Sequence, residues 1–444
     1  MSIQMTLSQA VCLSWFAHQL PSIHNQKTWN VDMKSLDRLK HSQAFIQFVL
    51  VGSVLLSFNS WGESFNVQVG PRPYFLISQM KPSPLKSKLE SCANKPLTPQ
   101  KFSIGHRGAA LMFPEHTRES YEAAARMGAG VIECDVTFTK DKALVCRHAQ
   151  NDLHATTNIL LTPLASKCSA PFKPYDPDKK TPATAECKTS DITLAEFKTL
   201  RGKMDGFNPM AQTPEEFVTG TPNWRTDLYS GSSSGTLMTH LESIQLFKVL
   251  GVKMTPELKE PAVPMPFHGM SQSDLAQKMI DEYKAAGVEP LDVYPQSFNR
   301  TDILYWIKNE PAFANQAVFL DSANNPRDLP DLETLKRYKQ DGVRIVAPPL
   351  FALLDVKDGR MVPSQYAQDV KSAGLEIIAW SLERSGALSH TKGGWYYQTV
   401  QSVVQNEGDI FEALHVLHHD VGIKGVFSDW PATTTYYANC MQPN

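Results

Sequence analysis

Two carboxylates spaced two residues apart are the first feature of the sequence that could do chemistry. Glu133 and Asp135 lie in the apolar stretch 130–137, which is predicted to be a β-strand. Because side chains alternate along a strand, both carboxylates face the same way. Neighbouring carboxylates repel each other unless a proton or a cation neutralises them, and oxygen ligands of this kind suit Ca²⁺ or Mg²⁺. A solvated strand end is the alternative interpretation.

Histidines end two further predicted strands. His106 closes the stretch 102–106 and is followed by Arg107, and His148 closes the stretch 143–148. Histidine suits proton transfer near neutral pH, and the planar arginine fork matches phosphate oxygens. A His-Arg pair in a turn can also be purely structural, so it indicates a site only in combination with other residues.

A third carboxylate follows the same rule at another strand end. Glu257 and Lys259 share a face at the end of the stretch 251–258, where Lys259 could offset charge on a phosphoryl transition state. The alternative is a salt bridge across the interior of the fold. The remaining strand ends have four residues that could line a substrate pocket: Gln296, Phe298, Trp380 and Trp430. A further carboxylate, Asp429, ends the last strand.

Short apolar strands alternating with helical stretches place these residues at strand ends. The candidate strands are 102–106, 130–137, 143–148, 251–258, 291–296, 317–321, 343–347, 375–380 and 425–429. Helical patterns lie between several of them, as at 118–127, 271–286, 329–341 and 409–421. This alternation implies a parallel sheet with crossover helices. About eight such units predict an α/β fold, a (β/α)8 TIM barrel over residues 101–444, whose chemistry belongs where strands end. A doubly wound open sheet is the alternative.

Two segments interrupt this order. Residues 151–234 form a long polar stretch rich in Thr, Pro and Lys, which predicts an insertion above the mouth of the barrel after its second strand. Residues 63–100 are rich in Pro, Ser and Lys and are predicted to be a linker or N-terminal extension.

The N-terminal residues 1–62 are predicted to be an extension that contains a signal peptide. The apolar run 44–58 is shorter than the roughly 20 residues of a membrane span, follows basic residues, and precedes the small residues of a cleavage site. Met33 would open a signal peptide of ordinary length. We therefore expect export to the periplasm or the medium, with no stable membrane span after cleavage. An uncleaved anchor or a buried helix of a cytosolic protein is the alternative.

The seven cysteines form no C-x-x-C pair, which argues against a structural zinc site. Export permits disulfides. The predicted bridges are Cys168–Cys187 and Cys92–Cys440, whereas Cys134 and Cys146 are predicted to be buried thiols.

The charge balance argues against a partner that is bound through the overall charge of the protein. Lys and Arg total 43 against 45 Asp and Glu, giving a formal net charge of -2. A nucleic-acid partner is not expected, because it would usually be matched by a basic excess. Any anionic substrate must therefore be bound by a local site.

The ordered set of motifs between residues 105 and 431 resembles the glycerophosphodiester phosphodiesterase family. The resemblance is carried by Gly105-His106-Arg107-Gly108-Ala109, Pro114-Glu115-His116-Thr117, Ser120, Gly128-Ala129, Glu133-x-Asp135, Thr139-Lys140-Asp141, Leu144-Val145, His148, Thr156-Thr157-Asn158, Pro256-Glu257-Leu258-Lys259 and Ser428-Asp429-Trp430-Pro431. It implies a (β/α)8 barrel with an insertion after the second strand, and cleavage of glycerophosphodiesters, such as glycerophosphocholine, into glycerol 3-phosphate and an alcohol.

The resemblance also implies roles for the site residues. One divalent cation, Ca²⁺ or Mg²⁺, would be held by three ligands: Glu133, Asp135 and Glu257. The general acid and base would be His106 and His148. The phosphate would be bound by Arg107 and Lys259, and Glu115 would orient the loop after the first strand.

Two positions depart from the family pattern. Ala149 follows His148 where the family usually has Asp, so Asp152 is a possible substitute. Trp430 stands where a Phe is frequent, which would enlarge an aromatic wall.

Three rival functions remain open on the same barrel: a phospholipase D-like enzyme, a phosphatidylinositol phospholipase and a catalytically silent binding protein. The complete motifs 114–117 and 256–259 argue against the two phospholipases, and the retained carboxylates and histidines argue against a silent protein. Water and a substrate hydroxyl are both left open as the nucleophile, and the sequence predicts no oligomeric state.

Overall fold

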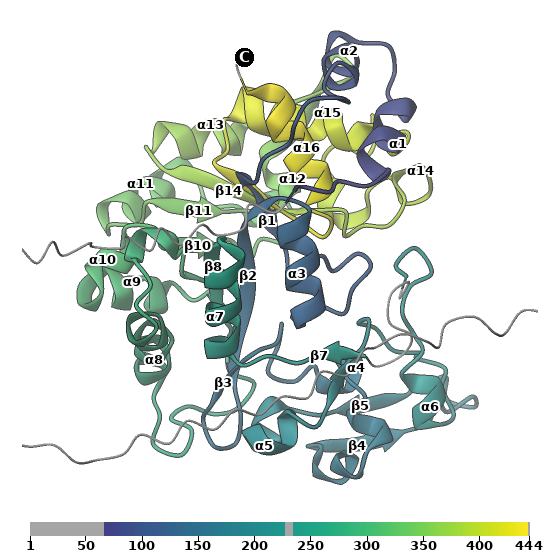
Figure 1. Ribbon diagram of the computed structural model, residues 1–444, viewed down its shortest axis with the longest axis vertical. Coiled ribbons are helices and arrows are strands. Elements are labelled where there is room, and N and C mark those ends of the chain that lie inside the picture. The colour runs from purple at the N-terminus through teal and green to yellow at the C-terminus, as the bar shows by residue number, and fades with distance from the viewer. Residues whose placement is uncertain (1–65, 227–233, 443–444) are drawn as a thin grey trace, which may run out of the picture. The chain divides into compact units, whose positions relative to one another are not determined.

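The computed structural model describes residues 66–226 and 234–442, shown in colour in Figure 1. The predicted signal peptide and Met33 lie outside the described residues. Within them, no helix is both long enough and apolar enough to span a bilayer.

Eight parallel strands close into a barrel, which excludes the open-sheet alternative. In their order around the barrel the strands are β1 (Gln100–Gly105), β2 (Ala129–Phe138), β8 (Lys253–Leu258), β9 (Gln296–Ser297), β10 (Val318–Leu320), β11 (Ile345–Ala347), β14 (Glu376–Leu382) and β15 (Gly425–Ser428). Closure is made by β1, which pairs in parallel with β15 on one side and with β2 on the other. Each barrel strand lies at or next to a stretch that the sequence predicted as a strand.

Helices cover the outside of the barrel (Figure 1). The longer ones are α3 (Arg118–Arg126), α7 (His240–Leu250), α8 (Gln272–Ala285), α9 (Arg300–Asn309), α11 (Leu332–Gln340), α13 (Gln365–Ser372), α15 (Asp409–His415) and α16 (Ala432–Met441). Shorter ones lie in the connections: α10 (Pro311–Ala314), α12 (Leu350–Leu353) and α14 (Leu388–Thr391). Side-chain hydroxyls begin several of them; the Thr239 and Ser271 hydroxyls accept backbone N–H groups in capping boxes that start α7 and α8.

Alternation along the strands builds an apolar interior with a polar layer above it. Ile104, Val131 and Phe427 are buried together in the lumen with residues of β10, β11 and β14. His106 and Glu133 lie two residues further along the same strands or just beyond them, and side chains two residues apart share a face. The apolar layer therefore leads directly into a polar layer at the carboxyl ends of the strands.

The insertion leaves the barrel through a hairpin that extends β2. The strand β3 (Leu144–Cys146) pairs antiparallel with the end of β2. Beyond it lie α4 (Leu153–Thr156), α5 (Leu194–Phe197), α6 (Pro214–Phe217), the hairpin of β4 (Ala170–Lys173) with β5 (Thr184–Glu186), and β6 (Arg201–Gly202) paired with β7 (Gly235–Thr236). These elements bury their own hydrophobic cluster, which includes Leu153, Ile192 and Phe217.

The segment predicted as a linker is folded from residue 66 onwards. It forms α1 (Arg72–Gln79) and α2 (Pro84–Glu90), which lie beside α16 (Figure 1). Leu76 and Leu89 are fully buried in the outer core, so the Pro- and Ser-rich composition marks helix starts rather than an irregular connection.

Both predicted disulfides are present, and the prediction for the other two paired cysteines is wrong. The Cα atoms are 4.2 Å apart in Cys168–Cys187 and 5.7 Å apart in Cys92–Cys440, which joins the end of α2 to α16. Cys134 and Cys146 are not free thiols, because they form a third bridge with Cα atoms 5.3 Å apart. The β2–β3 hairpin brings them together, a pairing that their separate predicted strands did not reveal.

Candidate active site

Three carboxylates converge at the carboxyl ends of two adjacent strands. Glu133 and Asp135 come from β2, and Glu257 comes from β8, where it lies opposite Asp135 in the strand register. All three are buried, and each offers an oxygen within 4.8 Å of the others. The structure therefore brings together the three residues that the sequence predicted as ligands of one cation.

The electrostatics of this carboxylate cluster favour a cation. Burial, with repulsion from Asp135 and Glu257, raises the pKa of Glu133 well above its ordinary value. Burial also raises the pKa of Glu257 to about 7, although Lys259 opposes the shift. Asp135 Oδ1 is buried and has no hydrogen-bond partner among the described residues. An all-oxygen donor set with a free buried oxygen fits a hard divalent cation.

Hydrogen bonds fix the orientation of the two β2 carboxylates. Glu133 accepts from the backbone N–H of Arg107 at 2.9 Å and from Gln296 Nε2 at 2.8 Å. Asp135 Oδ2 lies 2.9 Å from His116 Nε2. Since Gln296 is fully buried and bound to Glu133, its contact here is with a carboxylate, and its predicted contact with substrate stays a prediction.

His106 lies between two acidic partners. Its Nδ1 is 2.5 Å from Asp429 Oδ1, and its Nε2 is 3.9 Å from Glu133 Oε2. Burial lowers the pKa of His106 to about 4, although Asp429 opposes the shift. The imidazole is therefore neutral at pH 7, and donation from Nδ1–H to Asp429 leaves Nε2 as a proton acceptor facing the carboxylate cluster.

His148 lies close to two carboxylates, those of Glu115 and Asp152. One ligand atom of each of Glu115, His148 and Asp152 lies within 4.8 Å of the other two. Burial, with the positive charges of Arg107 and Lys259, holds the pKa of His148 well below its ordinary value. Asp152 lies three residues after Ala149, the position where the family usually has Asp. Its carboxylate is therefore close enough to influence His148.

The turn after β1 puts two residues in the left-handed region, and the second of them must be glycine. Arg107 has a φ of 57°, and Gly108 has a φ of 94° with no room for a Cβ against Ser120. This backbone aims the Arg107 N–H at Glu133 while its guanidinium binds Glu115 Oε2 at 2.8 Å. Burial raises the pKa of Glu115, but Arg107 and Arg384 outweigh burial and hold it well below its ordinary value.

Three residues near the site were not predicted as functional from the sequence: His116, Arg384 and Asp205. His116 belongs to a quoted motif but received no role. Arg384 follows β14 and binds Asp429 at 3.0 Å, Glu115 at 3.4 Å and Asp205 of the insertion at 3.4 Å. Only the position of Arg384, two residues after a strand end, could have indicated it; nothing in the local sequence marks Asp205.

A cavity of about 720 Å³ opens beside Glu257 and Lys259. Its lining includes two predicted pocket residues, Phe298 and Trp380. Trp430 lies elsewhere: it is buried to 8% exposure and lines a separate apolar cavity of about 710 Å³ between α1 and the loop after β1. The aromatic side chain that follows Asp429 therefore packs toward the N-terminal helices.

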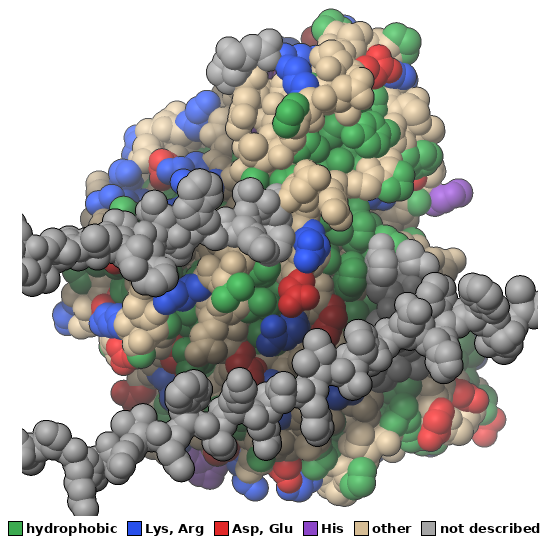
Figure 2. All heavy atoms as spheres, in the orientation of Figure 1, with side chains coloured by type: hydrophobic (Ala, Val, Ile, Leu, Met, Phe, Trp, Pro, Cys, Tyr) green, Lys and Arg blue, Asp and Glu red, His purple; other side chains and the backbone are tan. Residues whose placement is uncertain are grey.

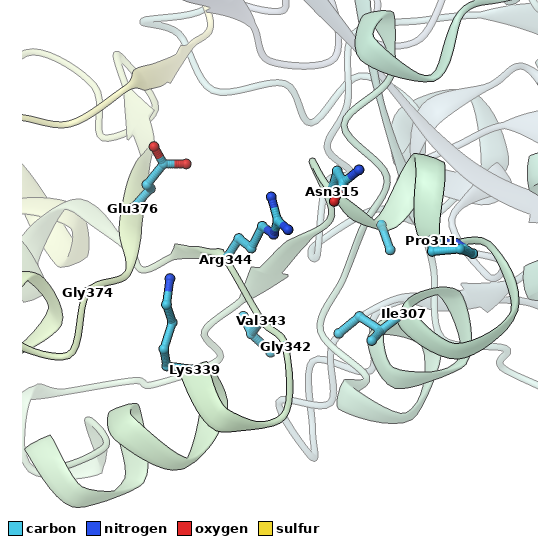
Figure 3. Close-up of a pocket in the computed structure, with 10 residues that line it drawn as sticks. Ile307, Pro311, Asn315, Lys339, Gly342, Val343, Arg344, Gly374 and Glu376 are labelled. Carbon is cyan, nitrogen blue, oxygen red and sulfur yellow. The ribbon is translucent and has the colours of Figure 1, made fainter.

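Another cavity lies at the opposite end of the barrel (Figure 3). It measures about 660 Å³, and its lining includes Lys339, Arg344 and Glu376. Arg344 directly precedes β11 and Glu376 begins β14, which places this cavity at the amino ends of the strands. It contains none of the predicted site residues.

The site and barrel are those of a phosphodiesterase family. The sequence profile of the glycerophosphoryl diester phosphodiesterase family matches residues 106–433, and the chain belongs to this family. Its enzyme class is therefore that of the phosphoric diester hydrolases.

The chain is also similar to individual proteins and to a solved structure. A protein of Arthroderma benhamiae called "Extracellular protein" is 45% identical over 246 residues, which cover 53% of this chain and 99% of that protein. A glycerophosphodiester phosphodiesterase of Haemophilus influenzae is 28% identical over 222 residues, which cover 49% of this chain and 55% of that enzyme. A Silicibacter pomeroyi structure described as a glycerophosphoryl diester phosphodiesterase shares the fold, with a TM-score of 0.52, 17% identity, and coverage of 80% of this chain and 97% of that one.

Proposed function

We propose that this protein hydrolyses glycerophosphodiesters to glycerol 3-phosphate and an alcohol, using one divalent cation, Ca²⁺ or Mg²⁺, held by Glu133, Asp135 and Glu257. The observation that carries the proposal is the convergence of these three buried carboxylates within 4.8 Å beside a cavity. The family membership supplies the reaction class.

The cationic side chains around the cluster suit a phosphodiester anion. Arg107 and Lys259 lie next to the carboxylates, and both keep their charge, since attraction to Glu115 and Glu257 outweighs burial and raises the pKa of each. They bind and neutralise the phosphate oxygens. When bound, the cation would polarise those oxygens and assist ionisation of the attacking hydroxyl.

The two histidines divide the proton transfers. His106, held neutral by burial and oriented by Asp429, accepts the proton of the attacking hydroxyl at Nε2. The new bond forms between that oxygen and phosphorus while the bond from phosphorus to the alcohol oxygen breaks. His148, beside Glu115 and Asp152, supplies the proton to the departing alcohol. Because its pKa is lowered in the free site, it takes up that proton when the negative charge of the bound phosphodiester raises its pKa. The same assignment serves water or a substrate hydroxyl as the nucleophile.

Glycerol 3-phosphate release from glycerophosphocholine tests the proposal. Turnover should disappear after chelation and return with Ca²⁺ or Mg²⁺, and the exposed variant Glu122→Gln should behave as the wild type. Turnover that survives complete chelation would overturn the role of the cation. Release of inositol phosphates from phosphatidylinositol without any glycerol 3-phosphate would instead identify a phospholipase.

We also propose that the protein works outside the cytosol. Three disulfides support this location, because cytosolic thiols are kept reduced, and the name of the Arthroderma relative agrees. Alkylation of the native protein should label none of the six paired cysteines without prior reduction.

A further inference from the structure

The cavity beside the carboxylate cluster has an aromatic wall that hydrolysis itself does not use. The cavity runs from Glu257 and Lys259 to Phe298, Trp380 and Trp395. Phe298 and Trp395 are 38% and 37% exposed, so large apolar faces are left open directly beside the place where a phosphodiester would bind. A phosphodiester carries an alcohol group on each side, and the cavity offers room for one of them along this wall.

The rings of this wall support one another. The centroids of Trp380 and Trp395 are 5.7 Å apart, with planes inclined by 34°. Phe298 lies edge-on to Trp380 at 5.9 Å, and Tyr396 lies edge-on to Trp395 at 4.9 Å. Such mutual packing fixes the two indoles before any ligand arrives, so little conformational entropy is lost on binding.

The polar atoms of the two indoles are already used. Trp380 Nε1 donates to the carbonyl of Ala347 at 2.8 Å, and Trp395 Nε1 donates to the carbonyl of Asn324 at 2.8 Å. The indoles therefore offer π faces and no hydrogen-bond donor. A polyol or a primary ammonium group, which needs directional hydrogen bonds, would be poorly served by them, whereas a weakly hydrated cation with methyl groups on its surface would be well served.

The two cationic side chains that line this cavity are already paired, Lys259 with Glu257 and Arg300 with Asp341. The exposed Glu260 adds a carboxylate to the same cavity. Lys259 is paired with Glu257 at 2.5 Å and its ammonium lies 5.7 Å from the centre of the Phe298 ring. Because the Lys259 ammonium already lies over the Phe298 ring, we expect a cation of the ligand to interact with the rings of Trp380 and Trp395 instead.

We infer that Trp380 and Trp395 form a head-group subsite for a quaternary ammonium, so that choline esters are the preferred glycerophosphodiesters. This inference rests on the proposed function and names its substrate class. In the bound arrangement the phosphate lies at Arg107 and Lys259, and the trimethylammonium group lies against the indoles. Contacts of this kind are worth about threefold to thirtyfold in affinity, depending on desolvation.

The test compares three substrates and two variants. The wild type should have a higher kcat/KM for glycerophosphocholine than for glycerophosphoethanolamine or glycerophosphoinositol. Trp395→Leu should lower kcat/KM for the choline ester about threefold to thirtyfold, mainly through KM, and change the inositol ester less than twofold. Trp380→Phe, which keeps an aromatic ring, should lose less. Tyr74→Leu, at 40% exposure on α1, is the matched control and should change nothing.

Equal losses on all three substrates would overturn the subsite, because they would show that Trp395 only supports the fold of the site. Absence of a choline preference in the wild type, or a larger loss on the inositol ester, would overturn it as well. Titration of the metal-free protein with choline and with ethanolamine, followed by tryptophan fluorescence, tests the subsite without turnover; choline should bind more tightly, and equal binding would overturn the inference. A protein that binds choline but hydrolyses no ester would contradict the proposed function alone.

Discussion

Two cavities of similar volume lie at opposite ends of the same barrel, yet only one resembles an active site. At the carboxyl ends of the strands, the cavity of about 720 Å³ adjoins three buried carboxylates. At the amino ends, the cavity of about 660 Å³ is lined by Lys339, Arg344 and Glu376, all of which are exposed (Figure 3). Size does not separate the two cavities. The difference is desolvation, which strengthens every charge interaction at one end and leaves the other to solvent screening.

Exposed charged side chains of the described residues are not gathered into one patch on the face of the molecule shown in Figure 2. On the face in Figure 2, blue and red side chains are scattered between tan and green ones rather than gathered into one field. With a net charge of -2, the chain offers no global attraction for an anion. The buried cluster at the carboxyl ends must therefore do the binding, and substitutions at the two ends should differ sharply in their effects.

The largest effect is expected from Asp135→Asn. The change keeps the shape of the side chain but removes charge from the one carboxylate of the three in the cluster that has a buried oxygen, Oδ1, without a hydrogen-bond partner among the described residues. Turnover should fall about 10³-fold or more, since a bound cation contributes several kcal/mol to the transition state. The thermal midpoint of the metal-free protein should fall, because burial is outweighed by His116 and Lys259, which hold the pKa of Asp135 below its ordinary value and so stabilise its charged form in the fold; the gain in midpoint on adding Ca²⁺ or Mg²⁺ should shrink as well. Wild-type turnover with an unchanged metal response would contradict the site.

The next largest effect is expected from His106→Ala and His148→Ala. Each should lower turnover about 10²–10⁴-fold if it transfers a proton. Metal-induced stabilisation should persist in both, because neither is assigned as a ligand. Turnover and thermal midpoint are measured together on each variant. A variant that loses stability but keeps its turnover per folded molecule would show a structural histidine.

The sequence predicted the barrel and the carboxylate cluster for a physical reason. Alternation within β2 sets Glu133 and Asp135 on one face, and a parallel barrel brings strand ends together, which makes Glu257 at the end of another strand a candidate neighbour. The family resemblance then named Glu257 as the third ligand. Arg384 and Asp205 could not be found in this way. They reach the site from loops, and their contacts depend on how the insertion folds over the barrel, which no local periodicity encodes. The Cys134–Cys146 bridge was missed because it depends on a hairpin register.

An intermediate effect is expected from Asp205→Asn. Asp205 holds Arg384, which in turn binds the Asp429 carboxylate that orients His106. Weakening this series of side-chain contacts should lower kcat about tenfold with little change in KM, as for other residues that orient a reactive group through an intermediate residue. Asp176→Asn, another acidic side chain of the insertion, is the matched control and should keep wild-type kcat. If both variants lose kcat equally, the insertion acts through its overall stability and not through Arg384.

The smallest effect is expected at the amino-end cavity. Arg344→Ala and Glu376→Gln alter exposed charges, and the ion pair of Glu376 with Lys424 joins two side chains that are each about half exposed. Exposed pairs contribute about 0–1 kcal/mol, so unfolding free energies should change by no more than this and kcat/KM should change less than about twofold. Denaturant unfolding and glycerol 3-phosphate release measure the two quantities on the same preparations. A tenfold loss of turnover with an unchanged unfolding free energy would show that the amino end is coupled to the reaction, and desolvation would then no longer be sufficient to distinguish the functional end of this barrel.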